Sequence, residues 1–129
     1  EGARYENCRV EGQSVMVRGE RRLLARLVRN LLDNASVHGT PPLSMVVHGD
    51  NATAVLDVMD AGPGVPETER ERVFSPFHRL GGGSKGMGLG LALVRQIARL
   101  HGGDVIVAPQ PDRPSCFRVT LPIAAGPIA

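Results

Sequence analysis

The chain has 129 residues, the length of one domain with a single hydrophobic core. Its net charge of +2 comes from arginines scattered along the sequence, without the clustered basic run that binding to nucleic acid would favour. No apolar run approaches the roughly 18 residues of a membrane span and no signal peptide is recognisable, so we expect a soluble piece with no direct membrane contact.

Hydrophobic periodicity divides the chain into short strands and amphipathic helices. The predicted elements, in order, are a strand (14–18), a helix (20–38), two hairpin strands (43–48 and 52–59), a short charged helix (67–74), a helix that begins at Gly88 and ends at Gly102-Gly103, and two strands (104–108 and 116–121). Helices interleaved with hairpin-connected strands predict the α/β (α+β) class, with helices packed on one face of a mixed or antiparallel sheet.

The two ends of the sequence carry little pattern. We expect residues 1–12 and 123–129 to be loose ends of one domain, cut from a longer protein because the chain starts without Met. Cys8 and Cys116 lie far apart and form no Cys-x-x-Cys motif, which favours reduced thiols.

Two asparagines lie within the apolar face of the first long predicted helix. On a helical wheel at about 100° per residue, Asn34 falls between Leu23 and Leu27, and Asn30 lies at the edge of the same arc. Burying an amide without a partner costs about 1 to 3 kcal/mol. A hydrogen bond to a backbone carbonyl would satisfy one such group. A stripe of Asn30, Asn34 and His38 instead suits Mg²⁺ carrying phosphates, because this ion needs only one or two protein oxygens.

A carboxylate stands at the end of the second hairpin strand, where an apolar residue is expected. Ala54, Leu56 and Val58 share one face of the strand, and Asp60 continues that face. An inward carboxylate must accept hydrogen bonds or become protonated. Asp60 is compatible with an ordinary turn cap, or with a ligand that approaches the bare backbone of the Gly-Pro-Gly at 62–64.

A glycine-rich loop leads into the second long helix. Residues 81–90 read Gly-Gly-Gly-Ser-Lys-Gly-Met-Gly-Leu-Gly, and free N–H groups at a helix N-terminus attract phosphate. The spacing fits a dinucleotide-binding pattern, but no buried strand precedes it, and no Gly-Lys-Ser/Thr follows it as in a Walker P-loop. Lys85 is either a phosphate ligand or a solvated loop lysine.

Taken in order, these segments resemble the sensor histidine kinases of two-component systems, within the superfamily of gyrase, Hsp90, histidine kinase and MutL nucleotide-binding domains. The segments that carry the resemblance are the N box (30–35), the first glycine box (60–64), the F box (74–77) and the second glycine box (86–91). The resemblance implies a Bergerat-type ATP-binding fold, a two-layer sandwich of three helices on a mixed sheet of about five strands. It also implies ATP and Mg²⁺ as ligands.

The resemblance implies a role for each matching residue. Asn34 would coordinate Mg²⁺ and Asn30 would line the phosphate side, as the two catalytic residues. Asp60 would accept the adenine amino group, above a floor shaped by Gly62 and Gly64. The other implied nucleotide-binding residues belong to the end of the first helix, the lid over ATP (67–85) and the second glycine box: His38, Phe77, Arg79, Lys85, Gly86, Met87, Gly88, Leu89 and Gly90.

The sequence departs from the superfamily pattern at two positions. Val37 stands where many kinases carry a basic residue that meets the phosphates, so His38, Arg79 or Lys85 would have to supply the charge. Hydrolytic members place a general-base Glu where this chain has Asn30, and an amide cannot accept a proton near neutral pH. This favours phosphoryl transfer to a histidine. The alternatives are an ATP-hydrolysing member and a catalytically silent nucleotide-binding regulatory domain.

None of the histidines lies in the His-Glu/Asp motif of a phosphoacceptor, so we expect the fragment to bind Mg-ATP without phosphorylating itself. The resemblance implies that it acts on a histidine-bearing dimerisation domain of the same protein. It also implies that the phosphate later passes to a response regulator. The implied setting is the cytoplasmic part of a membrane-anchored sensor kinase.

Overall fold

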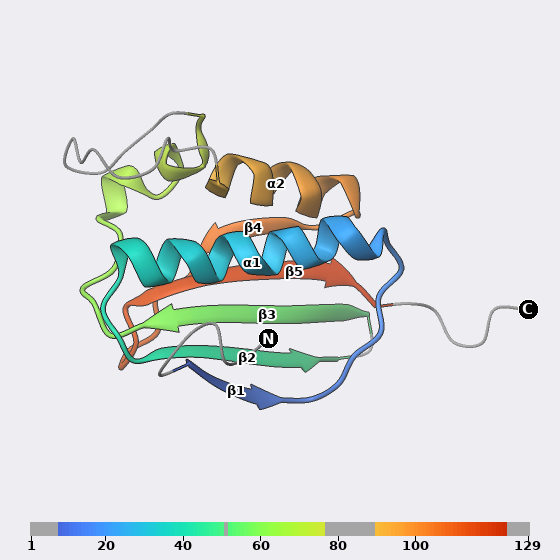
Figure 1. Cartoon of the computed structure of the whole chain (residues 1–129), viewed down its shortest axis with the longest axis horizontal. Coiled ribbons are helices and arrows are strands. Elements are labelled where there is room, and N and C mark those ends of the chain that lie inside the picture. The colour runs from blue at the N-terminus through green and yellow to red at the C-terminus, as the bar shows by residue number, and fades with distance from the viewer. Residues whose placement is uncertain (1–7, 51, 77–89, 124–129) are drawn as a thin grey trace, which may run out of the picture.

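The computed structural model describes residues 8–50, 52–76 and 90–123 (Figure 1). A five-stranded sheet forms one layer and the α-helices cover one of its faces (Figure 1). The elements, in chain order, are β1 (Cys8–Gly12), α1 (Arg21–His38), β2 (Leu43–Gly49), β3 (Thr53–Asp60), the 3-10 turns η2 (Glu67–Glu69) and η3 (Arg72–Phe74), α2 (Gly90–Leu100), β4 (Asp104–Val107) and β5 (Ser115–Pro122).

The sheet is mixed, with the strand order β1-β2-β3-β5-β4. β1 runs parallel to β2, while β2 with β3, β3 with β5, and β4 with β5 are antiparallel pairs. The predicted class, helices on one face of a mixed sheet, is therefore confirmed. Where the sequence predicts one short helix over 67–74, the described chain forms the two turns η2 and η3.

The core lies between the helices and the sheet. Leu27 and Leu31 on α1 and Val94 on α2 are at most 1% exposed, as the helical spacing of apolar residues predicts. They face Val58 of β3 and Val119 of β5, which alternate with outward residues along their strands. Burial of this shared apolar face fixes both helices against the strands that end at the candidate site.

The helical layer is also tied together at the end where α1 begins. The Nδ1–H of His101 donates to the backbone carbonyl of Ile97 at 2.8 Å, and its Nε2 accepts the backbone N–H of Glu20 at 3.0 Å. Glu20 is the N-cap of α1, and its carboxylate accepts the N–H groups of Arg22 and Leu23. His101 therefore connects the chain that leaves α2 with the chain that enters α1.

The first strand lies earlier than the sequence predicts, at Cys8–Gly12 instead of residues 14–18. The expectation of a loose end through residue 12 is therefore wrong for residues 8–12. Gly12 has φ of 111°, and a Cβ there would overlap the carbonyl of Val47, so the chain leaves the sheet at this glycine. The alternation at 14–18 belongs to an irregular segment in which Met16 is 77% exposed.

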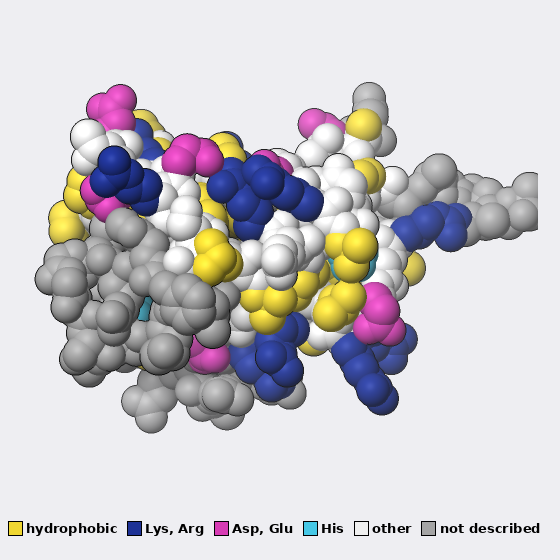
Figure 2. Space-filling view, turned by 90° about the horizontal axis from the view of Figure 1, so that it is seen from above, with side chains coloured by type: hydrophobic (Ala, Val, Ile, Leu, Met, Phe, Trp, Pro, Cys, Tyr) yellow, Lys and Arg dark blue, Asp and Glu magenta, His cyan; other side chains and the backbone are white. Residues whose placement is uncertain are grey.

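The surface carries mixed charges. Figure 2 shows Lys and Arg side chains in separate groups, interspersed with acidic and hydrophobic side chains, on the face seen from above. Within the described ranges, no helix is long and apolar enough to cross a membrane. Both cysteines are free thiols.

Candidate functional site

Asp60, the last residue of β3, is buried, as its inward position on the strand predicts. Its Oδ1 accepts the backbone N–H groups of Thr40 at 3.1 Å and Gly62 at 2.7 Å, and its Oδ2 accepts the hydroxyl of Ser115 at 2.6 Å. A carboxylate offers about four acceptor positions. Three donors among the described residues therefore hold the group in one orientation and leave, as far as those residues are concerned, one further acceptor position.

Two glycines, Gly39 and Gly62, lie against this carboxylate, and a side chain at either position would overlap it. A Cβ at Gly39 would lie 2.5 Å from the carboxylate carbon of Asp60, and one at Gly62 would lie 2.8 Å from Oδ1. Gly64 has φ of 89°, in the left-handed region that favours glycine, and a Cβ there would lie 2.6 Å from the carbonyl oxygen of Pro114. Bare backbone from the end of α1 and from the loop after β3 thus lies directly against the Asp60 carboxylate.

The two asparagines of α1 differ in their partners. The side-chain Nδ2 of Asn30 donates to the backbone carbonyl of Gly90 at 3.4 Å, so one N–H of this amide has a backbone partner. Asn34 lies one turn further along, is half-buried, and forms no side-chain hydrogen bond within the described part of the chain. Asn30 therefore joins α1 to the first residue of α2, and the amide of Asn34 is left for another partner.

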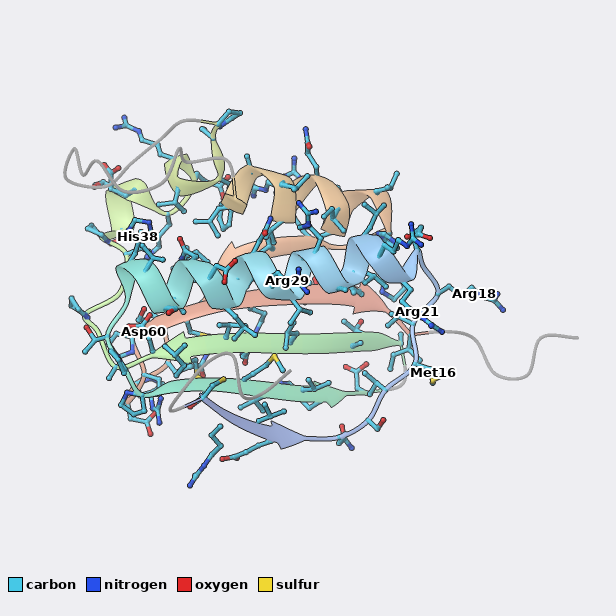
Figure 3. The ribbon with its side chains drawn as sticks, viewed as in Figure 1. Met16, Arg18, Arg21, Arg29, His38 and Asp60 are labelled. Carbon is cyan, nitrogen blue, oxygen red and sulfur yellow. The ribbon has the colours of Figure 1, made fainter. Side chains whose placement is uncertain are left out.

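Two of the residues predicted to meet a nucleotide, His38 and Asp60, lie at one end of the described structure. Figure 3 shows His38 at the C-terminal end of α1 and Asp60 at the end of β3, both at the end opposite Arg21, which opens α1. His38 is exposed, and the preceding Val37 is 52% exposed. The end of α1 and the end of β3 thus lie at one end of the sheet, and the start of α2 contacts α1 at Asn30, about two turns before His38.

The segment before the glycine-rich loop is anchored by an aromatic contact. Phe74 of the F box is 4% exposed, and its ring meets that of Phe117 edge to face, with 6.0 Å between centroids and 87° between planes. Gly90 is the exposed first residue of α2, and a Cβ there would meet no atom of the described residues within 4 Å. The other predicted residues of the loop lie outside the described residues: Phe77, Arg79, Lys85, Gly86, Met87, Gly88 and Leu89.

Three residues that shape the site were missed by the sequence reasoning, which treated Gly39 only as a helix stop. Thr40 contributes a backbone N–H, which no side-chain pattern can reveal. Ser115 lies opposite Asp60 in the register of β3 and β5. A signal for it exists, because Ser115 precedes Phe117 and Val119 on the inward face of the last strand and is polar.

Residues 19–125 match the family model described as "Histidine kinase-, DNA gyrase B-, and HSP90-like ATPase". The chain belongs to this family. Because the matched residues include the site around Asp60 and Asn34, the resemblance seen in the sequence is confirmed at the level of the family.

Curated relatives are sensor kinases. Sensor protein CutS of Streptomyces coelicolor is 38% identical over 118 residues, covering 86% of this chain and 28% of CutS. The adaptive-response sensory kinase SasA of Crocosphaera subtropica is 39% identical over 113 residues, covering 83% of this chain and 29% of SasA. The chain thus spans less than a third of the length of these relatives.

Solved structures share the fold along nearly the whole chain. The mycobacterial sensor histidine kinase MprB superposes with a TM-score of 0.73 at 34% identity, covering 94% of this chain and 85% of that one. The ATP-binding domain of PrrB from Mycobacterium tuberculosis gives a TM-score of 0.74 at 30% identity, with coverages of 96% and 87%. The chain is therefore similar to the ATP-binding domain of a histidine kinase over 94% or more of its length.

Proposed function

We propose that this chain is the ATP-binding catalytic domain of a sensor histidine kinase, which holds Mg-ATP while the γ-phosphate passes to a histidine of another domain. The observation that carries the proposal is Asp60, a buried carboxylate fixed by three protein donors with one acceptor position left beside bare glycine backbone. Sensor kinases among the relatives support it.

The free acceptor position of Asp60 suits the exocyclic amino group of adenine. An amino group donates a hydrogen bond, whereas guanine carries a carbonyl oxygen at the corresponding ring position, which a carboxylate would repel. Thr40, Gly62 and Ser115 orient the carboxylate before the base arrives, so little side-chain freedom is lost on binding.

The amide oxygen of Asn34 fits a magnesium ion that enters with the phosphates. Mg²⁺ keeps an octahedral shell of oxygens and takes only one or two of them from the protein. Within the described ranges, no group of three or more His, Cys, Asp or Glu side chains is placed to hold a metal. When bound, the ion supplies positive charge that neutralises the phosphates.

The start of α2 is the proposed phosphate end of the site. The first N–H groups of an α-helix have no partner within the helix and favour phosphate oxygens. Gly90 provides this terminus, and Asn30 holds it against α1. The proposal extends to His38 and to the loop residues Phe77, Arg79, Lys85, Gly86, Met87, Gly88 and Leu89 on the family resemblance alone.

The identity of Asn30 supports transfer over hydrolysis. Its amide donates to the carbonyl of Gly90 and cannot take a proton from water near neutral pH. A neutral imidazole nitrogen is already nucleophilic, so positioning and charge neutralisation are the main requirements for transfer to histidine. ATP hydrolysis therefore remains the weaker candidate.

The proposed partners belong to the longer protein and its pathway. They are a histidine-bearing dimerisation domain of the same protein, and a response regulator that later receives the phosphate on an aspartate. The proposed setting is the cytoplasmic side of a membrane-anchored sensor kinase.

A phosphorylation assay tests the proposal. The domain is mixed with γ-labelled ATP, Mg²⁺ and the helical domain of the same protein that bears the acceptor histidine. We expect a label on the helical domain that is acid-labile and base-stable, as phosphohistidine is, and no label on the isolated chain. Steady phosphate release by the isolated chain, without transfer, would support hydrolysis instead.

A further inference from the structure

Arg95, near the middle of α2, connects three parts of the molecule. Its Nη1 pairs with Oε1 of Glu71 at 3.1 Å, and its Nε pairs with Oδ1 of Asp104 at 3.2 Å. Its guanidinium carbon lies 4.7 Å from the centre of the Phe74 ring. One side chain therefore joins α2 to β4 and to the segment that contains η3.

These contacts differ from an ordinary surface ion pair because the Arg95 side chain is largely buried. The Arg95 side chain is only 16% exposed. Burial disfavours its charge, but the hydrogen bonds with Glu71 and Asp104 outweigh this effect and raise the pKa of Arg95. A guanidinium directs several N–H groups in a fixed plane and stacks on an aromatic ring, which a lysine cannot do. The three contacts thus depend on arginine in particular.

Arg95 lies on α2, whose first residue, Gly90, lies at the proposed phosphate end of the site. Asn30 holds Gly90 from the side of α1. Arg95 lies five positions after Gly90 and holds the same helix from the side of β4 and η3. Phe74, under the guanidinium, also packs against Phe117 of β5. The orientation of the α2 N-terminus is therefore fixed from both sides.

We propose that Arg95 is a positioning residue for phosphate binding: through its contacts with Glu71, Asp104 and Phe74 it sets the start of α2 where the ATP phosphates are received, without touching the nucleotide. This inference rests on the proposed function. The space around Asp60 is built by β3, β5 and the backbone after α1, none of which Arg95 contacts through a hydrogen bond. Loss of Arg95 therefore weakens binding of the triphosphate and leaves binding of the adenine base unchanged.

Arg95→Met tests this separation, since methionine keeps the apolar contact and removes the charge. The affinity of a non-hydrolysable ATP analogue with Mg²⁺ is measured by calorimetry, and that of adenosine by NMR titration. We expect the analogue to bind about tenfold more weakly and adenosine to bind as in the natural chain. Arg95→Lys, which keeps the charge without the planar fork, is expected to restore only part of the affinity.

Arg99→Met is the matched control. Arg99 lies one turn further along α2 and also pairs with Asp104, at 3.2 Å, but its side chain is 58% exposed. We expect its removal to leave the affinity for the analogue unchanged. Glu71→Gln provides a second test, because the Glu71 side chain is 78% exposed and its replacement should not disturb folding. It is expected to reproduce part of the Arg95→Met loss.

The outcomes separate the inference from the proposed function. An equal loss of analogue and adenosine affinity in folded Arg95→Met would refute the positioning role, as would full affinity for the analogue in Arg95→Met or Glu71→Gln. If Arg95→Met does not fold, Glu71→Gln decides. A natural chain that binds neither ligand would refute the proposed function itself.

Discussion

Asp60 is held by three donors among the described residues, and a side chain at Gly39 or Gly62 would overlap its carboxylate. In Asp60→Asn, the amide oxygen would be kept by the N–H groups of Thr40 and Gly62, which places the new NH₂ where the free acceptor position lay. The amide and the adenine amino group would then both be donors, so we expect affinity for a fluorescent ATP analogue to fall at least about tenfold. The Ser115 hydroxyl can turn to accept, so the fold should survive.

Asp112→Asn serves as the control for that titration. Asp112 is exposed and lies in the loop between β4 and β5, so its replacement should leave the affinity unchanged. Full affinity in Asp60→Asn would contradict the assignment of the base-binding carboxylate.

Gly62 and Gly90 should respond differently to alanine. A Cβ at Gly62 would approach Oδ1 of Asp60 to 2.8 Å, so Gly62→Ala is expected to lower the free energy of unfolding by about 1 to 3 kcal/mol. A Cβ at Gly90 meets no atom of the described residues within 4 Å, and alanine is the better helix former, so Gly90→Ala should not destabilise the fold. Urea unfolding of both variants checks the contrast; equal destabilisation would contradict it.

Asn34 is expected to control the response to metal. Its side chain has no hydrogen bond within the described part of the chain, so Asn34→Ala should change stability little while removing one oxygen ligand. In the natural chain, chelation of Mg²⁺ with EDTA should weaken ATP binding. In Asn34→Ala, binding should already be weak and should respond little to EDTA. An unaltered EDTA response in the variant would place the metal elsewhere.

At the scale of elements, α2 is fixed to β4 by an ion-pair cluster. Asp104 accepts from Arg95 and Arg99 and from the backbone N–H of Val105. Burial tends to raise the pKa of Asp104, but the bonds from Arg99, Val105 and Arg95 together lower it. Because the folded state then holds its proton less tightly than the unfolded state, this carboxylate stabilises the fold above its ordinary pKa of about 3.9, and the contribution is lost as pH falls through the lower folded value.

Asp104→Asn should therefore flatten the acid side of the stability profile. Denaturant unfolding of the variant and the natural chain across the range below about pH 5 compares the two. We expect the difference between them to shrink as pH falls. A difference that grows toward low pH would contradict the sign of this linkage.

The elements themselves follow from local patterns in most places. The spacing of Leu27 and Leu31 defines α1, and Gly39 with the prolines after it ends the helix where the sequence predicts. The first strand was misplaced because alternation at 14–18 also suits exposed irregular chain, whereas pairing with β2 decides that Cys8–Gly12 is the strand. Pairing across the sheet is a long-range property, and local periodicity does not contain it.

The polar residues of the candidate site were predictable as anomalies, but their hydrogen-bond partners were not. Asp60 and Asn34 stood out because polar groups occupied apolar positions. Ser115 is 55 positions from Asp60, and Gly90 is 60 positions from Asn30. Such bonds depend on the sheet register and on helix packing, so only the assembled structure reveals them.

At the scale of the whole molecule, Cys116 reports on global opening. Its side chain is 1% exposed, and burial together with the nearby Asp57 carboxylate raises the pKa of the thiol to about 12. Since the thiolate is the reactive form, we expect no labelling of Cys116 in the folded protein at neutral pH and rapid labelling in denaturant. Mass spectrometry of a Cys8→Ser variant, which leaves a single thiol, checks this. Fast labelling without denaturant would show local opening of β5.

The bonds of His101 require a proton on Nδ1 and a lone pair on Nε2, because one ring nitrogen faces a carbonyl and the other faces an N–H. The ring is thus held as one neutral tautomer just after α2, whose C-terminal end lies opposite the end of β3 (Figure 1). The two ring-nitrogen resonances of His101 therefore report whether α1 and α2 are connected at this end. They give a spectroscopic record of whether nucleotide binding at one end of the molecule disturbs the other.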